Sequence, residues 1–346
     1  MDQDNDPLSF LKSIQEDFGG VITFERFMQE ALHHPVFGYY AQQIKDVGRT
    51  GDFSTSASLD PHLGKAIAQW IIARARELKW TNIPIIEVGA GNGMLARIIL
   101  KHLGWRNRLR TDYMICETSP TLRKRQEKSL QWYRIRWINN LEEGLKKTGG
   151  KAIIFSNELV DAFPCRVFQK SEVHWRELGI TIHPDGSLTE MLFAPLESDA
   201  WFQNFSTLPE GQRVERHDTY RSWLQQWGPQ WMEGRLLTID YGDRSTSLYA
   251  GSPKGSLRSY WKHQRYSGRD LYARFGKQDL TADVNFSDLI EWGKCLGWGE
   301  RDFMTQREFL KQWIPKKDLD RSSSRFLVPG DAGDAFKVLE QGPAIH

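Results

Sequence analysis

An apolar run, a glycine loop and a helical pattern follow one another without a break at residues 85–100, and this constrains the fold most strongly. The letters IIEVGAGNG place Glu87 before glycines at 89, 91 and 93, and MLARIIL continues with helical periodicity. Backbone amides at such a strand-to-helix turn can approach a nucleotide closely, since no side chain intervenes. The run therefore predicts part of an α/β fold with a cofactor at the loop.

The glycine spacing distinguishes between two kinds of cofactor. The dinucleotide fingerprint GxGxxG needs a glycine where this chain has Met94, so the match is to GxGxG. A second apolar run, DYMICE, ends in Glu117, where the next parallel strand would present an acid to ribose hydroxyls. Glu87 can accept from a cationic amine, and such charge-assisted bonds contribute ~1.5–3 kcal/mol each. These features favour S-adenosylmethionine over a nicotinamide; the alternative is a tight turn whose acids are solvated.

Composition excludes several classes of protein. The 346 residues suffice for two domains or one enlarged α/β domain, and a net charge of +2 gives no global attraction to nucleic acid or membrane. Three separated cysteines form no CxxC pair, which predicts a reducing compartment without structural zinc or disulfides. The acidic N-terminus resembles no signal or presequence, and no stretch is apolar enough to span a membrane. We therefore expect a cytoplasmic protein.

The order of the predicted elements indicates a core that is interrupted once. Predicted strands are 83–88, 112–117, 135–138, 151–156, 235–242 and 336–341, and predicted helices are 7–18, 23–34, 61–79, 93–103, 119–131, 218–232 and 286–297. The alternation predicts a parallel sheet with helices on both faces. We expect four segments, which are 1–60, an N-terminal helical cap and active-site loop; 61–163, the first part of the core; 164–216, a β-rich substrate insertion; and 217–346, the second part of the core.

Polar residues follow the predicted strand 151–156 directly. The segment NELVDAFP brings Asn157, Glu158 and Asp161 to the carboxyl end of a strand, where open α/β sheets bind ligands. A pair of carboxylates suits a guanidinium acceptor, because each can accept two parallel N–H bonds and their charge favours loss of a proton. We predict Glu158 and Asp161 as catalytic; the alternatives are that Asp161 caps a turn and that Glu158 faces water.

Three further positions are candidates for substrate binding or catalysis. Asp240 and Tyr241 end the strand LLTIDYGD, so we predict that both bind the substrate, although such a tyrosine more often simply packs. His263, in SLRSYWKH, is the histidine that we predict as a base. The segment QDLTADVNFSDL adds polar residues before a helix, some of which can be N-caps: Asp279, Thr281, Asp283, Asn285 and Ser287.

Several motifs, in this order, together resemble one known family. They are GYY at 38–40, VGRTGDFSTS at 47–56, the glycine loop, NELVDAFP at 157–164, LLTIDYGD, GSLRSYWKH at 255–263 and DLTADVNFSDL at 279–289. From about residue 20 onward the chain resembles the MidA family of class I methyltransferases, whose mitochondrial members assist assembly of respiratory complex I. The resemblance implies a Rossmann-like seven-stranded sheet, S-adenosyl-L-methionine as donor and, for the mitochondrial members, symmetric dimethylation of a protein arginine.

The resemblance also implies a cofactor site, in which the loop 51–56 closes over the ligand. Its predicted residues are Asp52, Phe53, Ser54, Thr55, Glu87, Gly89, Gly91, Asn92, Gly93, Glu117 and Asn157. The chain departs from the family where TSPEIS is common and TSASLD stands here, so Ala57-Ser58 replaces a Pro-Glu pair. This departure weakens any substrate assignment that depends on the glutamate.

We therefore expect a methyltransferase that uses S-adenosyl-L-methionine and acts on a protein arginine. We expect no metal, nucleic acid or membrane partner, and a homodimer is left open. An NAD-dependent oxidoreductase is disfavoured by Met94. A non-catalytic scaffold that binds the cofactor, and a methyltransferase acting on a small molecule, remain as alternatives; the β-rich insertion mildly favours a protein partner.

Overall fold

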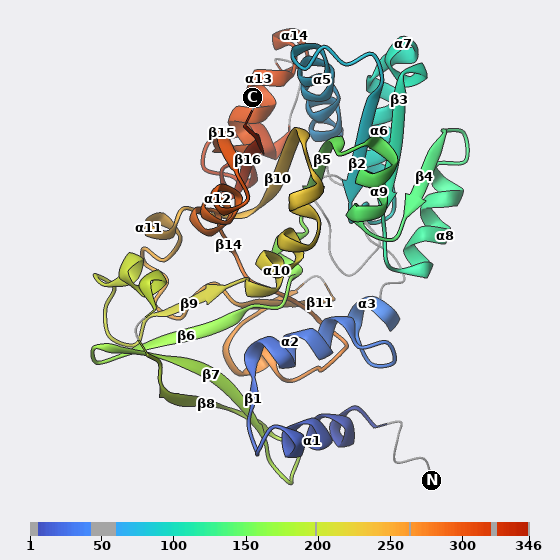
Figure 1. The fold of residues 1–346 in the computed structure, drawn as a ribbon. Helices are drawn as coiled ribbons and strands as arrows, with labels where there is room; N and C mark the ends of the chain where they lie inside the picture. The colour runs from blue at the N-terminus through green and yellow to red at the C-terminus, as the bar shows by residue number, and fades with distance from the viewer. Residues whose placement is uncertain (1–5, 43–59, 198, 263, 320–323, 345–346) are drawn as a thin grey trace. The chain divides into compact units, whose positions relative to one another are not determined.

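The computed structural model describes residues 6–42, 60–197, 199–262, 264–319 and 324–344 (Figure 1). By its internal contacts the chain divides into two compact units, each built from three separate segments. We call Met1–Lys45, Val160–Tyr220 and Asp243–Asp288 the antiparallel unit. We call Asp46–Leu159, Arg221–Gly242 and Leu289–His346 the parallel-sheet unit. Within the described residues, no helix has the length and apolar character needed to cross a membrane.

The parallel-sheet unit is organised around a twisted sheet whose strands follow the order β15-β16-β10-β5-β2-β3-β4. These strands are β2 (Ile83–Val88), β3 (Thr111–Cys116), β4 (Ile135–Ile138), β5 (Lys151–Asn157), β10 (Glu233–Asp243), β15 (Trp298–Thr305) and β16 (Phe336–Pro343). Neighbours from β10 to β4 pair in parallel, whereas β16 is antiparallel to both β10 and β15. The carboxyl ends of β2, β3, β5 and β10 therefore lie along one edge.

Helices cover both faces of this sheet. They are α5 (Pro61–Glu77), α6 (Met94–His102), α7 (Gly104–Leu109), α8 (Pro120–Ser129), α9 (Leu141–Thr148), α13 (Gln306–Trp313), α14 (Lys316–Leu319) and α15 (Ala332–Ala335), with the 3₁₀ turns η4 (Gly228–Gln230) and η6 (Arg325–Leu327). Ile85 belongs to a buried cluster with residues of α5 and α6. Its neighbour Ile86 lies on the opposite face, where it contacts Gly144 of α9. The short strand 83–88, which is apolar except for Glu87, is thus buried on both sides.

The antiparallel unit contains two smaller sheets. The larger is formed by β1 (Ile22–Thr23), β6 (Arg166–Ser171), β7 (His174–Ile182), β8 (Leu188–Pro195) and β9 (Arg213–Arg216). The smaller is formed by β11 (Arg258–Trp261), β12 (Gln264–Tyr266) and β13 (Asp279–Thr281). The remaining elements are α1 (Pro7–Asp17), α2 (Phe24–His33), α3 (Tyr39–Gln42), α11 (Ser245–Leu248), η2 (Val160–Ala162), η3 (Ala200–Phe205), η5 (Gly268–Leu271) and β14 (Val284–Asn285). Two of the boundaries between the units fall within helices, which are α10 (Asp218–Trp227) and α12 (Phe286–Cys295).

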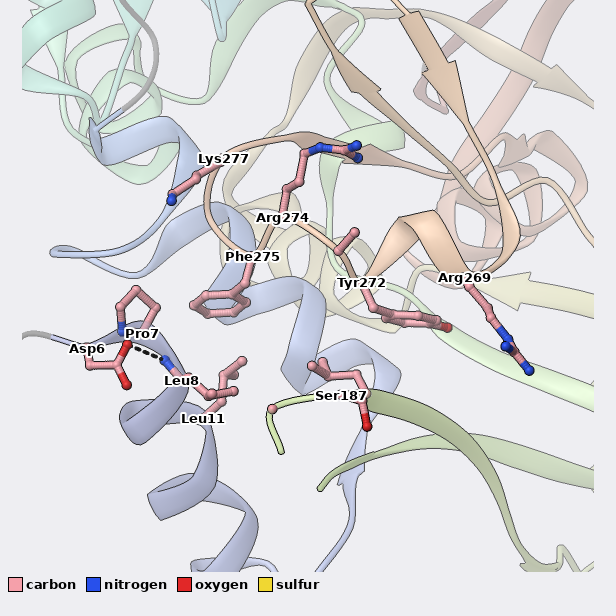
Figure 2. A pocket seen from close by; sticks show the side chains of 13 residues that line it. Asp6, Pro7, Leu8, Leu11, Ser187, Arg269, Tyr272, Arg274, Phe275 and Lys277 are labelled. Atoms are coloured by element: carbon pink, nitrogen blue, oxygen red, sulfur yellow. Dashed lines mark hydrogen bonds between the residues drawn. The ribbon is translucent and has the colours of Figure 1, made fainter. Parts of the chain in front are cut away.

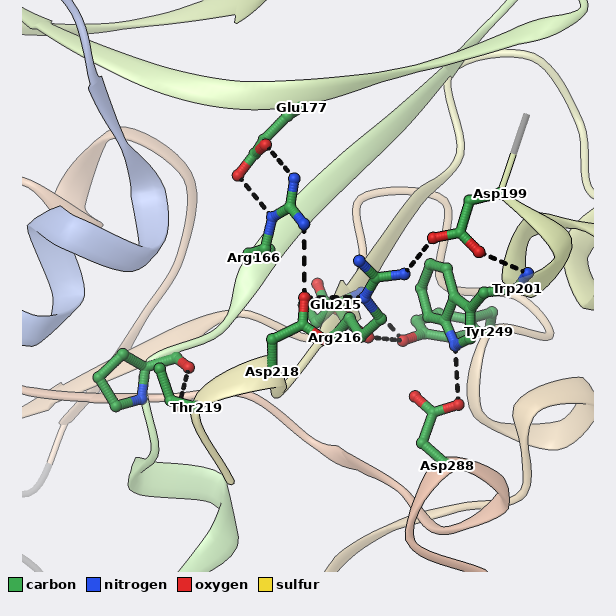
Figure 3. A network of polar contacts seen from close by, with 11 residues as sticks. Arg166, Glu177, Asp199, Trp201, Glu215, Arg216, Asp218, Thr219, Tyr249 and Asp288 are labelled. Atoms are coloured by element: carbon green, nitrogen blue, oxygen red, sulfur yellow. Dashed lines mark hydrogen bonds and ion pairs between the residues drawn. The ribbon is translucent and has the colours of Figure 1, made fainter. Parts of the chain in front are cut away.

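Aromatic packing and a network of ion pairs stabilise the larger sheet (Figure 3). Phe168 lies in a buried aromatic cluster, and the guanidinium groups of Arg166 and Arg216 stack over its ring at 4.8 and 5.2 Å. Arg166 donates to Glu177 through Nε at 2.9 Å, and Arg216 donates through Nε to Asp218 at 2.9 Å. Because each of these half-buried guanidinium groups pairs with a carboxylate, we attribute a structural role to the network.

Two parts of the chain differ from the arrangement expected from the sequence. Residues 243–288, assigned to the core, have their contacts within the antiparallel unit, because β11, β12 and β13 form a sheet of their own. The N-terminal residues form α1 and α2 as expected, but β1 between them pairs with β7 of the insertion. The amide of Gln15 in α1 also donates to the Ile182 carbonyl at 3.2 Å.

Candidate functional site

The glycine loop joins β2 to α6 at the carboxyl edge of the parallel sheet. Gly89, Gly91 and Gly93 have φ values of 69°, 55° and 79°, all in the left-handed region that side chains disfavour. A Cβ at Gly89 would lie 2.9 Å from Leu159 Cδ1, and one at Gly93 would lie 2.9 Å from Ser129 Oγ. The loop is therefore restricted to glycine by backbone conformation and by space, and it lies against the turn that follows β5.

Glu87 ends β2 beneath this loop and is almost completely buried. The hydroxyl of Tyr113, on β3, donates to Glu87 Oε2 at 2.6 Å. Burial raises the pKa of Glu87 to about 7, the Tyr113 hydrogen bond opposes that rise, and Glu117 adds to it. Because Tyr113 is a neutral donor, it orients Glu87 without cancelling its charge, and the charged form of Glu87 suits a cationic amine.

Glu117 follows β3, and its carboxylate is held by two donors. The backbone N–H of Ser119 donates to Oε1 at 2.9 Å, and the side-chain amide of Gln126 donates to Oε2 at 2.9 Å. Burial raises the pKa of Glu117, and these hydrogen bonds lower it. An ionised carboxylate has about four acceptor positions, so the oriented group keeps capacity for ribose hydroxyls.

Gln126 connects three parts of the candidate cofactor site, and the sequence analysis missed it. Its amide also donates to the Gly91 carbonyl at 2.8 Å, and its oxygen accepts from the Trp137 indole at 3.0 Å. The side chain is fully buried, although glutamine is usually exposed. A signal was present, since Gln126 lies four residues after the buried Leu122 on the inner side of α8.

Asn92, predicted to contact the cofactor, has a local role at the start of α6. Its side-chain oxygen accepts from the Met94 backbone N–H at 3.0 Å, and its carbonyl accepts from Ser129 Oγ at 3.1 Å. The side chain therefore supplies the cap that Gly93, lacking a side chain, cannot supply.

The turn after β5 brings Asn157 and Glu158 to the same edge of the sheet. Glu158 has a φ of 53°, which is unusual for a residue with a side chain, and its backbone N–H donates to the Ile239 carbonyl at 2.9 Å. The Asn157 amide donates to Glu158 Oε1 at 3.0 Å. A strained backbone held by hydrogen bonds fixes where this carboxylate points.

Asp240 and Tyr241, predicted to bind the substrate, have structural contacts here. Asp240 is fully buried and accepts from the backbone N–H groups of Leu159 and Tyr241, at 3.1 and 2.8 Å. The Tyr241 ring packs on Phe336, with 3.8 Å between ring centroids. Asp240 thus holds the turn that presents Glu158, and the substrate contacts of both residues stay predictions.

Asp161 lies in the antiparallel unit, in η2, and is buried. Burial raises its pKa to about 6, with Arg258 opposing the rise and Asp283 adding to it. Its backbone carbonyl accepts from the Ala282 N–H at 3.1 Å. This environment fits the prediction that the Asp161 carboxylate accepts a proton near neutral pH.

The predictions for Asp52, Phe53, Ser54, Thr55 and His263 lie outside the described residues. The structure therefore brings together the glycine loop, both acids and the Asn157-Glu158 turn at one edge of the parallel sheet.

A separate cavity of about 460 Å³ opens in the antiparallel unit (Figure 2). Its walls include Leu8 and Leu11 of α1 and, across from them, the rings of Tyr272 and Phe275. Its lining includes none of the predicted site residues that the structure describes. The candidate site therefore lies at the strand ends and not in this cavity.

The residues at the strand ends fit S-adenosyl-L-methionine. The glycine loop is a cradle that side chains at 89 and 93 would fill, Glu117 has acceptor capacity for hydroxyls, and Glu87 can balance an ammonium group. When bound, this cofactor supplies an electrophilic methyl group on a sulfonium.

Known proteins resemble this chain over most of its length. It is 28% identical over 341 residues to the mitochondrial protein arginine methyltransferase NDUFAF7 homolog of Caenorhabditis elegans, covering 85% of this chain and 73% of the relative. It is 28% identical over 328 residues to the NDUFAF7 protein of Danio rerio, covering 84% and 73%.

A solved structure of a COG1565 superfamily member from Burkholderia thailandensis, bound to S-adenosyl-homocysteine, has a TM-score of 0.84 and 25% identity, covering 98% of this chain and 92% of that one. These similarities confirm the MidA-like assignment, the class I methyltransferase fold and S-adenosyl-L-methionine as the cofactor. Residues 66–303 match the Methyltransf_28 family, and the chain belongs to this family of S-adenosyl-L-methionine-dependent methyltransferases.

Proposed function

We propose that this methyltransferase modifies a protein arginine and forms symmetric dimethylarginine. The observation that carries the proposal is the pair of carboxylates Glu158 and Asp161, which follow β5 in a chain whose relatives are named protein arginine methyltransferases. The β-rich insertion supports a protein as the acceptor, since a small molecule requires no such additional unit.

The chemical task of the carboxylates follows from the acceptor. A guanidinium has a pKa above ~12 and must lose a proton as its nitrogen gains a carbon. Asp161, whose pKa burial raises to about 6, is ionised at neutral pH and is a better proton acceptor than an ordinary aspartate. Glu158 is oriented by Asn157 and the strained turn, so we assign it to hold the guanidinium N–H groups.

Most of the rate acceleration should come from orientation, because holding the reactants in position can lower the activation barrier by ~7–11 kcal/mol. The buried Asp240 contributes by fixing the turn, and it is therefore a positioning residue.

Several finer expectations belong to the same proposal. We propose a seven-stranded core with a capping role for the N-terminal helices, closure of the loop 51–56 over the cofactor, and His263 as an additional base. Cytoplasmic location and a homodimer stay predictions from the sequence, and the named relatives are mitochondrial. Fractionation and light scattering test these two points.

The direct test is an incubation of purified protein with radiolabelled S-adenosyl-L-methionine and a lysate from a strain lacking this gene. We expect a labelled protein that yields symmetric dimethylarginine after acid hydrolysis, identified by mass spectrometry. Label found only on small molecules would replace the protein acceptor by a metabolite. Cofactor binding without any labelled species would favour a scaffold.

A further inference from the structure

We propose that an exposed surface of the parallel-sheet unit, rich in arginine and tryptophan, docks an acidic region of a partner protein. This surface, which we call the Arg-Trp surface, is formed by α7 and by the turn that precedes β4. Its residues are Trp105, Arg106, Arg108, Leu109, Trp132 and Arg134. Docking at this place is independent of which molecule accepts the methyl group, because these residues lie outside the candidate cofactor and acceptor sites.

Both parts of the Arg-Trp surface lie at the amino ends of neighbouring strands. Helix α7 ends just before β3 begins, and Trp132 lies in the turn just before β4 (Figure 1). Strands β3 and β4 pair in parallel, and the guanidinium of Arg108 lies over the ring of Tyr133 at 5.8 Å, so the two parts are in contact. The glycine loop follows the carboxyl end of β2, which is parallel to β3. The surface and the cofactor loop therefore lie at opposite ends of one sheet.

Three large apolar side chains of this surface are exposed. Trp105 is 62% exposed, Leu109 is 80% exposed and Trp132 is 87% exposed. Trp105 and Leu109 are four residues apart in α7, so they lie on the same side of the helix. Tryptophan is highly buried on average, as Trp70 and Trp227 are in this chain. Exposed apolar groups gathered in one place indicate a site of protein contact.

The charged residues of both segments are all basic. Residues 104–110 and 130–136 contain five arginines and no acid, in a chain whose 46 basic and 44 acidic residues are otherwise nearly balanced. Asp112, just beyond the first segment, is paired with Arg136 of the second at 3.0 Å. The surface thus has an excess of positive charge, which attracts and orients a partner with the opposite charge.

The chemistry of the surface suits a protein better than other anions. Tryptophan and arginine dominate the binding energy of protein interfaces, and arginine can hold a carboxylate by two parallel N–H bonds. Leu109 requires an apolar partner, which a protein supplies and a phosphate backbone does not. The guanidinium of Arg106 already lies over the Trp105 ring at 5.2 Å, which leaves less of that ring for a stacked base. A symmetric second copy would bring like charges face to face.

The test measures binding of defined probes to the full chain by fluorescence anisotropy, in about 0.1 M salt. The first probe is a labelled peptide of repeated Asp-Glu-Leu, and its uncharged partner is a peptide of repeated Asn-Gln-Leu. Labelled oligothymidylate represents nucleic acid. We expect the acidic peptide to bind at least about tenfold more tightly than either of the others, and its affinity to fall as the salt concentration rises.

Variants locate the binding on the Arg-Trp surface. Arg108→Glu combined with Arg134→Glu should weaken binding of the acidic peptide at least about tenfold. Trp132→Ala should weaken it several-fold, because the apolar contact is lost. The matched control reverses two exposed cations on β15 and α13, Arg301→Glu with Lys311→Glu, and should leave the affinity unchanged. All variants should bind S-adenosylhomocysteine as the wild type does, which shows that the parallel-sheet unit is folded.

Several results would overturn the assignment. They are equal affinity for the two peptides, unchanged affinity in the double variant of Arg108 and Arg134, and an equal loss in the control. Tighter binding of oligothymidylate would replace the protein partner by nucleic acid. Self-association in sedimentation that the double variant abolishes would assign the surface to a second copy of this chain.

Discussion

Two pairs of buried acids in this protein differ in what surrounds them. In the parallel-sheet unit, Glu87 and Glu117 receive hydrogen bonds from a tyrosine hydroxyl, an amide and a backbone N–H. In the antiparallel unit, the positive charge of Arg258 opposes the rise in pKa that burial causes at Asp161 and Asp279. Neutral donors orient a carboxylate without cancelling its charge, whereas a shared cation partly cancels it.

The difference shows two ways in which one chain keeps a pair of acids buried. Neutral donors orient the first pair towards a cofactor without adding an opposite charge. The charge of Arg258 makes the second pair tolerable inside the antiparallel unit. Each pair should therefore respond to mutation in a different assay.

The largest expected effect tests whether the glycine loop alone decides cofactor binding. Gly91→Val should abolish measurable binding of S-adenosylhomocysteine, because a branched side chain is strained at a φ of 55° and would occupy the approach of the nucleotide. Isothermal calorimetry measures it. Gly104→Val is the control, since Gly104 has a φ of 75° with open space around it and lies outside the loop. Unchanged affinity in folded Gly91→Val would refute the site.

The next effect distinguishes the two acids of the cofactor site, Glu87 and Glu117, from the carboxylates that we predict to contact the methyl acceptor. Glu158→Gln should lower methyl transfer by about 10²-fold or more, the usual contribution of a positioned acid or base, while affinity for S-adenosylhomocysteine stays within about twofold. The amide oxygen of glutamine can still accept from Asn157, so the turn should persist. A radiolabel assay and calorimetry on the same sample measure both quantities. Full turnover would count against the carboxylate clamp.

A smaller effect tests the buried amide beneath the glycine loop. Gln126→Ala should weaken S-adenosylhomocysteine binding about tenfold, because Glu117 loses a donor and the loop carbonyl of Gly91 loses its partner. A thermal melt on the same variant would reveal whether a loss of affinity reflects general destabilisation.

A further effect concerns stability and pH and not ligand binding. Burial raises the pKa of Glu87 to about 7, above the ~4.3 of an unfolded chain, so between these values the folded protein binds more protons than the unfolded one. Its contribution is thus complete below pH ~4.3 and is lost as the pH rises through 7. Between pH 5 and pH 8 the free energy of unfolding of the wild type should fall by about 2–3 kcal/mol more than that of Glu87→Gln. Urea titrations at both pH values measure this, and parallel curves would contradict it.

Much of the core was predictable because its signals are local. The strand 83–88 and the strand 135–138 have the bounds expected, and the glycine loop was assigned from its spacing. Helix α9 was missed because its sequence, LEEGLKKT, has few apolar residues, and β15 was missed because charges interrupt it on the edge of the sheet. A helix or strand with a weak hydrophobic pattern can be recognised only from the residues that it packs against.

The partners of the site residues were not predictable in the same way. Tyr113 and Gln126 act on acids that lie on other elements, and the charge of Asp161 acts on Asp279 across more than a hundred positions of sequence. Such pairings depend on sheet order and register, which one sequence does not reveal. Asp240 illustrates the same limit, since its position at a strand end indicated a ligand contact while its hydrogen bonds serve the backbone.

The position of β16 has a consequence for biosynthesis. This strand inserts between β10 and β15, so both neighbours expose unpaired backbone until Phe336–Pro343 has joined the sheet. Open strand edges recruit other chains, and a nascent or truncated product ending before Phe336 would be prone to self-association.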